Sequence, residues 1–119
     1  MTFDKLLNIM DILLGENGCP WDKEQTHQSL RSNMLEECQE AIEAIDSGDA
    51  ASIKEELGDV LLQVVFHAKI AQQAGHFTMD DIINTLVDKL IRRHSHVFGT
   101  DTAQSAEDAL KIWKSNKEK

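Results

Sequence analysis

A short turn at residues 47–49 separates two long segments whose composition and spacing favour helix. Gly48 is suited to end a helix because glycine readily adopts the left-handed backbone conformation. Asp49 is a common N-cap for a helix that follows. We therefore expect helices at about residues 27–46 and 50–74. A chain that folds back at Gly48 places them side by side and antiparallel, so the sequence predicts a helical hairpin as the core.

The rest of the chain also favours helix. Periodic apolar residues and capping signals predict three further helices, at about residues 3–14, 79–94 and 106–116. One proline and no tyrosine argue against an all-β fold. A chain of 119 residues is the size of one domain. We therefore expect a single all-α domain over residues 1–119 with about five helices.

Apolar side chains follow one face of each hairpin helix, and we expect these two faces to form its core. The first face comprises Met34, Leu35, Cys38, Ala41, Ile42 and Ile45, and the second comprises Ile53, Leu57, Val60, Leu61, Val64 and Ala68. The second helix also carries Leu62, Val65 and Phe66 on its opposite side. A helix that is apolar nearly all round is buried nearly all round. We therefore expect this helix to lie at the interface of a homodimer with a four-helix-bundle-type core, or of a higher oligomer.

Two acidic pairs lie on either side of the turn, Glu37 with Glu40 and Glu56 with Asp59. Each pair has i,i+3 spacing, which places both members on one helix face. In a hairpin centred on Gly48, Glu40 comes level with Glu56 and Glu37 with Asp59. Carboxylates gathered in this way repel one another unless a cation joins them. A solvated acidic surface is the ordinary explanation of such pairs, but the matched positions favour a metal site here.

Charge is distributed unevenly along the sequence. The net charge is −9, with 4 basic and 14 acidic residues in 1–59 but 8 basic and 7 acidic residues in 60–119. The negative total argues against general nucleic-acid binding. An acidic centre that holds metal, together with a basic element that meets phosphate, would produce this split. An acidic, solvated surface would also produce it.

Several motifs, in order along the chain, resemble those of the MazG-like all-α nucleoside triphosphate pyrophosphohydrolases. They are Gly18-Cys19-Pro20-Trp21-Asp22-Lys23-Glu24-Gln25-Thr26-His27, Glu36-Glu37-x-x-Glu40, Glu55-Glu56-Leu57-Gly58-Asp59-Val60-Leu61, Lys89-Leu90-Ile91-Arg92-Arg93-His94-Ser95-His96-Val97-Phe98, and Trp113 with Lys117. The resemblance covers almost the whole chain. It departs from the family at Ser95, where proline is usual. Better-known members also carry two such domains in tandem, whereas this sequence holds one.

The resemblance implies hydrolysis of nucleoside triphosphates between the α- and β-phosphates, giving a nucleoside monophosphate and pyrophosphate. It implies that Glu37, Glu40, Glu56 and Asp59 are metal ligands. Hard carboxylate oxygens suit Mg²⁺, or Mn²⁺. Glu36 is a candidate for a water-activating base or for a residue behind the ligands, and a solvated helix face is an equal alternative.

The resemblance also implies substrate contacts for Trp21, Lys23, Lys89, Arg93, Trp113 and Lys117. Lys89 and Arg93 are i,i+4 neighbours that could grip the phosphates and stabilise the leaving pyrophosphate. Trp21 could stack on a nucleobase or plug the end of the bundle. Lys23 could reach phosphate or be an ordinary exposed lysine. Trp113 could instead be a core residue, and Lys117 could belong to a charged chain end.

Two alternatives remain open. The enzyme could take a narrower substrate, phosphoribosyl-ATP or dUTP, although the Cys19-Pro20-Trp21 loop favours the MazG branch. The chain could also be a non-catalytic, metal-binding helical dimer. No apolar run is long enough to span a bilayer and residues 1–14 do not resemble a signal peptide, so we expect a cytoplasmic protein without a membrane partner.

Overall fold

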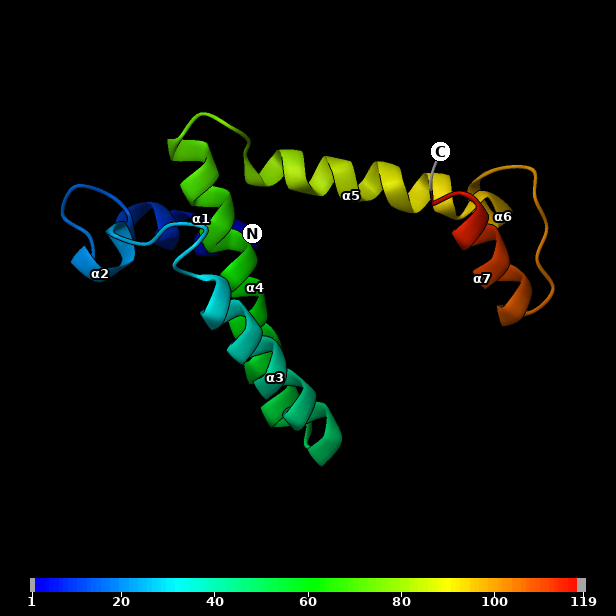
Figure 1. Ribbon diagram of the computed structural model, residues 1–119, viewed down its shortest axis with the longest axis horizontal. Helices are drawn as coiled ribbons and strands as arrows, with labels where there is room; N and C mark the ends of the chain where they lie inside the picture. The colour runs from blue at the N-terminus through cyan, green and yellow to red at the C-terminus, as the bar shows by residue number, and fades with distance from the viewer. Residues whose placement is uncertain (1, 118–119) are drawn as a thin grey trace. The chain divides into compact units, whose positions relative to one another are not determined.

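The computed structural model describes residues 2–117, and over these residues it contains helices and no strands. The helices are α1 (Thr2–Leu13), α2 (Pro20–Lys23), α3 (Arg31–Ser47), α4 (Ala50–Gln73), α5 (Met79–Arg93), α6 (Ser95–Phe98) and α7 (Ala106–Ser115) (Figure 1). The all-α prediction is confirmed. The five long helices lie in the predicted regions, although α3 begins later than expected. The two additional helices, α2 and α6, have four residues each. No helix within residues 2–117 has the length and hydropathy needed to cross a membrane.

The start of α3 lies four residues later than predicted. Residues 26–30 form a separate turn in which the Thr26 amide donates to Ser29 Oγ at 2.8 Å and the Ser29 amide donates to Thr26 Oγ1 at 3.0 Å. The Leu30 amide donates to the Thr26 carbonyl at 3.2 Å. Thr26 therefore caps this turn, and regular helix begins only at Arg31.

The chain forms two compact units, the first ending at Met79 and the second beginning at Asp80. The centre of the first unit is the predicted hairpin, in which α3 and α4 pack side by side (Figure 1). Gly48 ends α3 in the left-handed conformation, with φ 72°. Asp49 caps α4 by accepting a hydrogen bond from the Ser52 amide at 3.1 Å. Both local signals act as the sequence indicated.

Helix α1 packs on α4 within the first unit. Asp11 and Lys69 form an ion pair at 2.7 Å, and Gln73 Nε2 donates to the Leu14 carbonyl at 3.3 Å. The buried apolar side chains of the unit are Met10, Leu14, Leu30, Ala41, Ala44, Val65, Phe66, Ala68, Ala71 and Met79. Phe66 is only 4% exposed within the single chain. The expectation that a second subunit covers Val65 and Phe66 was therefore wrong, because this chain's own core covers them.

The predicted apolar faces of the hairpin are also placed differently. Leu35 is 73% exposed. Other members of the two faces are exposed as well: Met34, Ile42, Ile45, Leu57 and Leu61. The helices meet instead through the face that carries the acids, where the only buried residues of α3 are the small Ala41 and Ala44. Both apolar faces are rotated from that contact in the same sense, so in an antiparallel pair they lie on one side of the hairpin. We call the six exposed residues the apolar face.

The second unit contains α6 and α7 in mutual contact. The buried Asn116 donates from Nδ2 to Ser95 Oγ at 2.7 Å, and Ser95 Oγ donates to Asp101 Oδ2 at 2.5 Å. Ser105 caps α7 by accepting from the Asp108 amide at 3.1 Å, as its sequence predicts. The serine that departs from the family pattern therefore joins α6, the following loop and the end of α7.

Candidate metal centre

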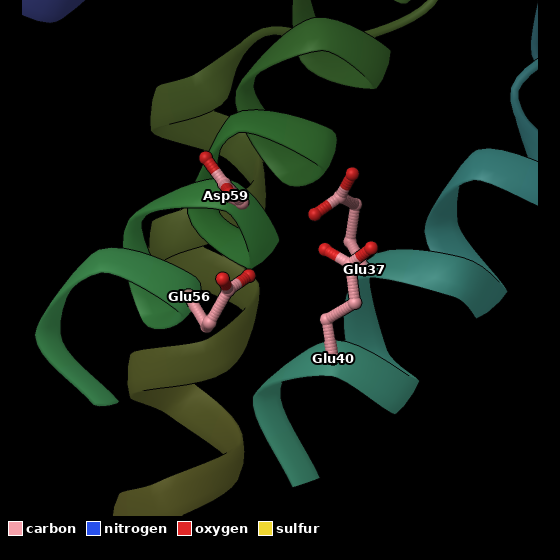
Figure 2. A group of neighbouring side chains, drawn as sticks. All are labelled: Glu37, Glu40, Glu56 and Asp59. Carbon is pink, nitrogen blue, oxygen red and sulfur yellow. The ribbon is translucent and has the colours of Figure 1, made fainter. Parts of the chain in front are cut away.

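Four carboxylates gather between α3 and α4. Glu37 and Glu40 come from α3, and Glu56 and Asp59 come from α4 (Figure 2). One oxygen from each residue lies within 4.8 Å of the oxygens from the other three. All four side chains are half-buried. The gathering that the i,i+3 spacing and the hairpin predicted is therefore present, although the acids lie at the helix contact rather than beside a large apolar core.

Neither helix supplies a basic partner to these acids. The pKa of the Glu37 carboxyl is raised above its ordinary value, first by burial and then by the charges of Glu40 and Asp59. The pKa of Glu56 is raised by burial, then by the same two neighbours. Glu37 Oε2 and Glu56 Oε2 are inaccessible to solvent and have no hydrogen-bond partner within residues 2–117. The cluster therefore favours uptake of positive charge.

The donor set fits a divalent cation. Four carboxylates offer hard oxygen ligands, which Mg²⁺ and Mn²⁺ prefer over softer donors. Two of their oxygens lack a hydrogen-bond partner in the part of the chain that the structure describes. A cation between the helices would satisfy those oxygens and relieve the repulsion that raises the two pKa values. Glu36 is outside this cluster, on an exposed side of α3, which favours the reading of a solvated helix face for it.

Cationic side chains and an aromatic ring meet in the second unit. The Arg93 guanidinium carbon lies 4.8 Å from the centroid of the Trp113 ring, and Lys117 Nζ lies 5.8 Å from it. Arg93 Nε is buried and has no hydrogen-bond partner among the described residues. Lys89 is one turn before Arg93 on α5 and is half-buried. Trp113 is half-buried, and its ring contacts the charged side chains of Arg93 and Lys117, so it is not a core residue.

The two N-terminal candidates have different surroundings. Trp21 is 55% exposed, which contradicts the alternative in which it plugs the end of the bundle. Its ring is free to stack on a planar ligand. Lys23 Nζ donates to the Glu16 carbonyl at 3.0 Å, which ties α2 to the preceding loop.

Sequence reasoning missed two polar residues on α4. His67 Nδ1 lies 2.7 Å from His27 Nδ1, with the two rings nearly parallel at 6°. Gln63 is buried, and its Oε1 has no hydrogen-bond partner within the described range 2–117. The signal was available, because Asp59, Gln63 and His67 follow one another at i,i+4 spacing and so share a helix face.

Comparison with known proteins identifies the family of this chain. Residues 25–98 match the family described as the MazG nucleotide pyrophosphohydrolase domain. A Thermotoga maritima protein named nucleoside triphosphate pyrophosphohydrolase/pyrophosphatase MazG is 55% identical over 105 residues, covering 88% of this chain and 41% of that protein. The nucleoside triphosphate pyrophosphohydrolase of Escherichia coli K12 is 47% identical over 111 residues, covering 92% of this chain and 42% of that protein.

A solved structure is similar over nearly its full length. The crystal structure of a mazG-related protein from Thermotoga maritima matches with a TM-score of 0.79 and 31% identity, covering 98% of this chain and 99% of that one. The chain spans less than half the length of the two curated relatives above. The expected family is confirmed: the chain belongs to the MazG nucleotide pyrophosphohydrolase domain family.

Proposed function

We propose that this chain hydrolyses nucleoside triphosphates between the α- and β-phosphates. Water supplies the oxygen that replaces the broken anhydride bond, and the products are a nucleoside monophosphate and pyrophosphate. The observation that carries the proposal is the convergence of four carboxylates within 4.8 Å, two of whose oxygens have no hydrogen-bond partner among the residues that the structure describes. Membership of the family supports the choice of reaction.

Glu37, Glu40, Glu56 and Asp59 would hold Mg²⁺, or Mn²⁺. A divalent cation there would neutralise triphosphate charge and make a bound water a better nucleophile. The protein's own contribution is to fix the four carboxylates on two packed helices before substrate arrives. Such preorganisation lowers the reorganisation needed during reaction. Glu36 remains our candidate for accepting the proton of the attacking water, a role that its exposed position leaves open to solvent competition.

The second unit would contribute positive charge and an aromatic surface. We assign phosphate contacts to Lys89 and Arg93, since cationic donors stabilise the charge that develops on a leaving pyrophosphate. Arg93 Nε is a buried donor with no hydrogen-bond partner in the described part of the chain, and an anionic oxygen would satisfy it. Trp113 and Lys117 would complete this contact. In the first unit, the exposed ring of Trp21 would stack on the base, and Lys23 is a further phosphate contact.

We also propose that the functional unit is a homodimer and that residues 1–119 act as one MazG-like domain. The apolar face exposes large side chains from both hairpin helices on one side. A continuous exposed apolar surface of this kind is typical of a protein interface. A second copy would cover it and form a four-helix core.

One assay tests the reaction. The purified chain is incubated with each nucleoside triphosphate, including dUTP, and Mg²⁺, and pyrophosphate and orthophosphate are measured separately. We expect pyrophosphate as the product. Its rate of release should fall about a hundredfold in Glu40→Gln, because this variant removes a ligand of the cation that would neutralise the reacting phosphates. Glu43→Gln, an exposed acid on the same helix, is the matched control and should keep wild-type activity. Orthophosphate release would mean that a different bond is cut.

The same assay decides between the classes of function. Turnover of dUTP alone would favour a narrow-substrate enzyme. If no triphosphate is cleaved by a folded, metal-binding protein, the chain is a binding module and the proposed reaction is wrong. Phosphoribosyl-ATP is included as a further substrate for the same reason.

A further inference from the structure

Gln63 is a buried polar residue in a helix contact. Its side chain lies on α4 and is only 6% exposed. Its Oε1 atom is inaccessible to solvent and has no hydrogen-bond partner among residues 2–117. A buried carbonyl oxygen left unpaired destabilises the fold, so buried polar groups are nearly always hydrogen-bonded. A leucine or methionine would fill the same space without this cost.

The position of Gln63 connects it to the acidic cluster. It is four residues beyond Asp59 and seven beyond Glu56, which places it about 40° and about 20° from them around the helix axis. All three therefore face α3. Helical side chains lean toward the N-terminus of their helix, so Gln63 leans back over the turn that carries Asp59. The step along the axis is about 6 Å, a distance that one intervening water molecule can span.

The chemistry of the side chain also suits this position. The cluster already holds four carboxylates, and the pKa of Glu37 and of Glu56 is raised by burial and by like charge. A fifth carboxylate would increase that repulsion. A neutral amide adds an acceptor oxygen without adding charge. Mg²⁺ usually keeps several waters when it binds to protein, and these waters are strong hydrogen-bond donors.

We propose that Gln63 is a positioning residue of the acidic centre, whose Oε1 accepts a hydrogen bond from a water molecule in the coordination shell of the divalent cation. The inference rests on the proposed function, because it requires the cation to bind at the four carboxylates. It assigns Gln63 a share in metal affinity through its effect on the outer coordination shell. Outer-shell partners of this kind typically change metal affinity 10–100-fold.

The experiment measures metal binding and stability separately. Mg²⁺ and Mn²⁺ are titrated calorimetrically into the full chain, and thermal unfolding is followed in EDTA. We expect Gln63→Met to lower the affinity for both metals about tenfold or more. Its Tm in EDTA should be equal to or above that of the wild type, because the unpaired amide is gone. Gln72→Met, an exposed glutamine on the same helix, should change neither quantity.

A second variant keeps the test decisive if Gln63→Met does not fold. Gln63→Asn keeps the amide but shortens the side chain by one carbon. This variant should fold in EDTA and should also bind both metals more weakly than the wild type. Wild-type metal affinity in either folded variant would overturn the inference. A lower Tm in EDTA with unchanged affinity would assign Gln63 to packing or to a hydrogen bond with His67, and would overturn it as well.

The same titrations distinguish failure of the proposed role of Gln63 from failure of the proposed metal centre. A wild-type chain that binds neither metal overturns the metal centre, and this inference with it. A wild type that binds metal and a Gln63→Met variant that binds it equally well overturn only the role of Gln63.

Discussion

The Nδ1 atoms of His27 and His67 lie 2.7 Å apart and join the turn before α3 to the middle of α4. One ring must donate its Nδ1 proton and the other must accept it, so the contact requires at least one neutral histidine. Burial, followed by the charge of His27, lowers the pKa of His67 below its ordinary value of 6.5. His67 therefore stays neutral at pH values at which a free histidine would begin to take up a proton.

This contact makes the stability of the protein depend on pH. The unfolded chain binds a proton at His67 more readily than the folded chain does, so acid favours unfolding. The stabilisation is fully present above about pH 6.5 and is lost as pH falls below it through the lower folded pKa. We expect the urea midpoint to fall between pH 7.5 and 5.5, and to fall less in His67→Asn. His76→Asn, at an exposed position, should behave as wild type; an equal fall in all three proteins would contradict the prediction.

Glu37→Gln should stabilise the metal-free protein. The raised pKa of Glu37 means that its charged form is disfavoured in the fold, so this penalty is present at neutral pH and disappears below about pH 4.5. In EDTA at pH 7.5 the variant should therefore have a higher Tm than wild type, and the difference should shrink toward pH 4.5. Mg²⁺ should raise the Tm of the wild type but not of the variant.

The matched control for that measurement is Glu43→Gln, which removes an exposed charge from the same helix. It should leave the Mg²⁺-dependent rise in Tm intact. A lower Tm for Glu37→Gln in EDTA would show that the carboxylate stabilises the metal-free fold, contrary to the repulsion inferred from the cluster.

Ile42→Lys should disrupt the proposed dimer. Ile42 belongs to the exposed apolar face, and a lysine there would bury an unpaired charge at the subunit contact. Sedimentation should show a wild-type dimer at micromolar concentration and a dissociation constant at least tenfold higher for the variant. Ile12→Lys changes an exposed isoleucine on α1 and serves as the control. A wild type that sediments as a monomer would refute the dimer.

Trp113→Leu should weaken substrate binding. The ring lies beneath the Arg93 guanidinium at 4.8 Å and orients it by cation–π attraction, typically worth about 0.5–2 kcal/mol. We expect KM for the nucleoside triphosphate to rise about threefold to tenfold, because each 1.4 kcal/mol corresponds to a factor of ten. Trp113→Phe keeps an aromatic face, so its KM should rise less than that of Trp113→Leu. Equal KM values for wild type and Trp113→Leu would remove Trp113 from the proposed contact.

Much of the local structure could be read from the sequence because its causes are local. Gly48 and Asp49 set the hairpin turn through backbone conformation and capping, and both act within a few residues of themselves. Once that turn is known, the period of the helix alone brings Glu37 and Glu40 near Glu56 and Asp59. The acidic centre was therefore predictable without any knowledge of packing.

Which side of each helix is buried was decided only by the tertiary structure. An apolar face shows that a surface avoids water, but it does not show whether the same chain or a second copy covers it. Here the small Ala41 and Ala44 let α3 approach α4 on the acidic side. Phe66 is buried within the single chain, whereas Leu35 is exposed. The contact of His27 with His67, 40 residues apart, likewise depends on how separate segments pack. Spacing along one helix cannot specify a partner that arrives from another.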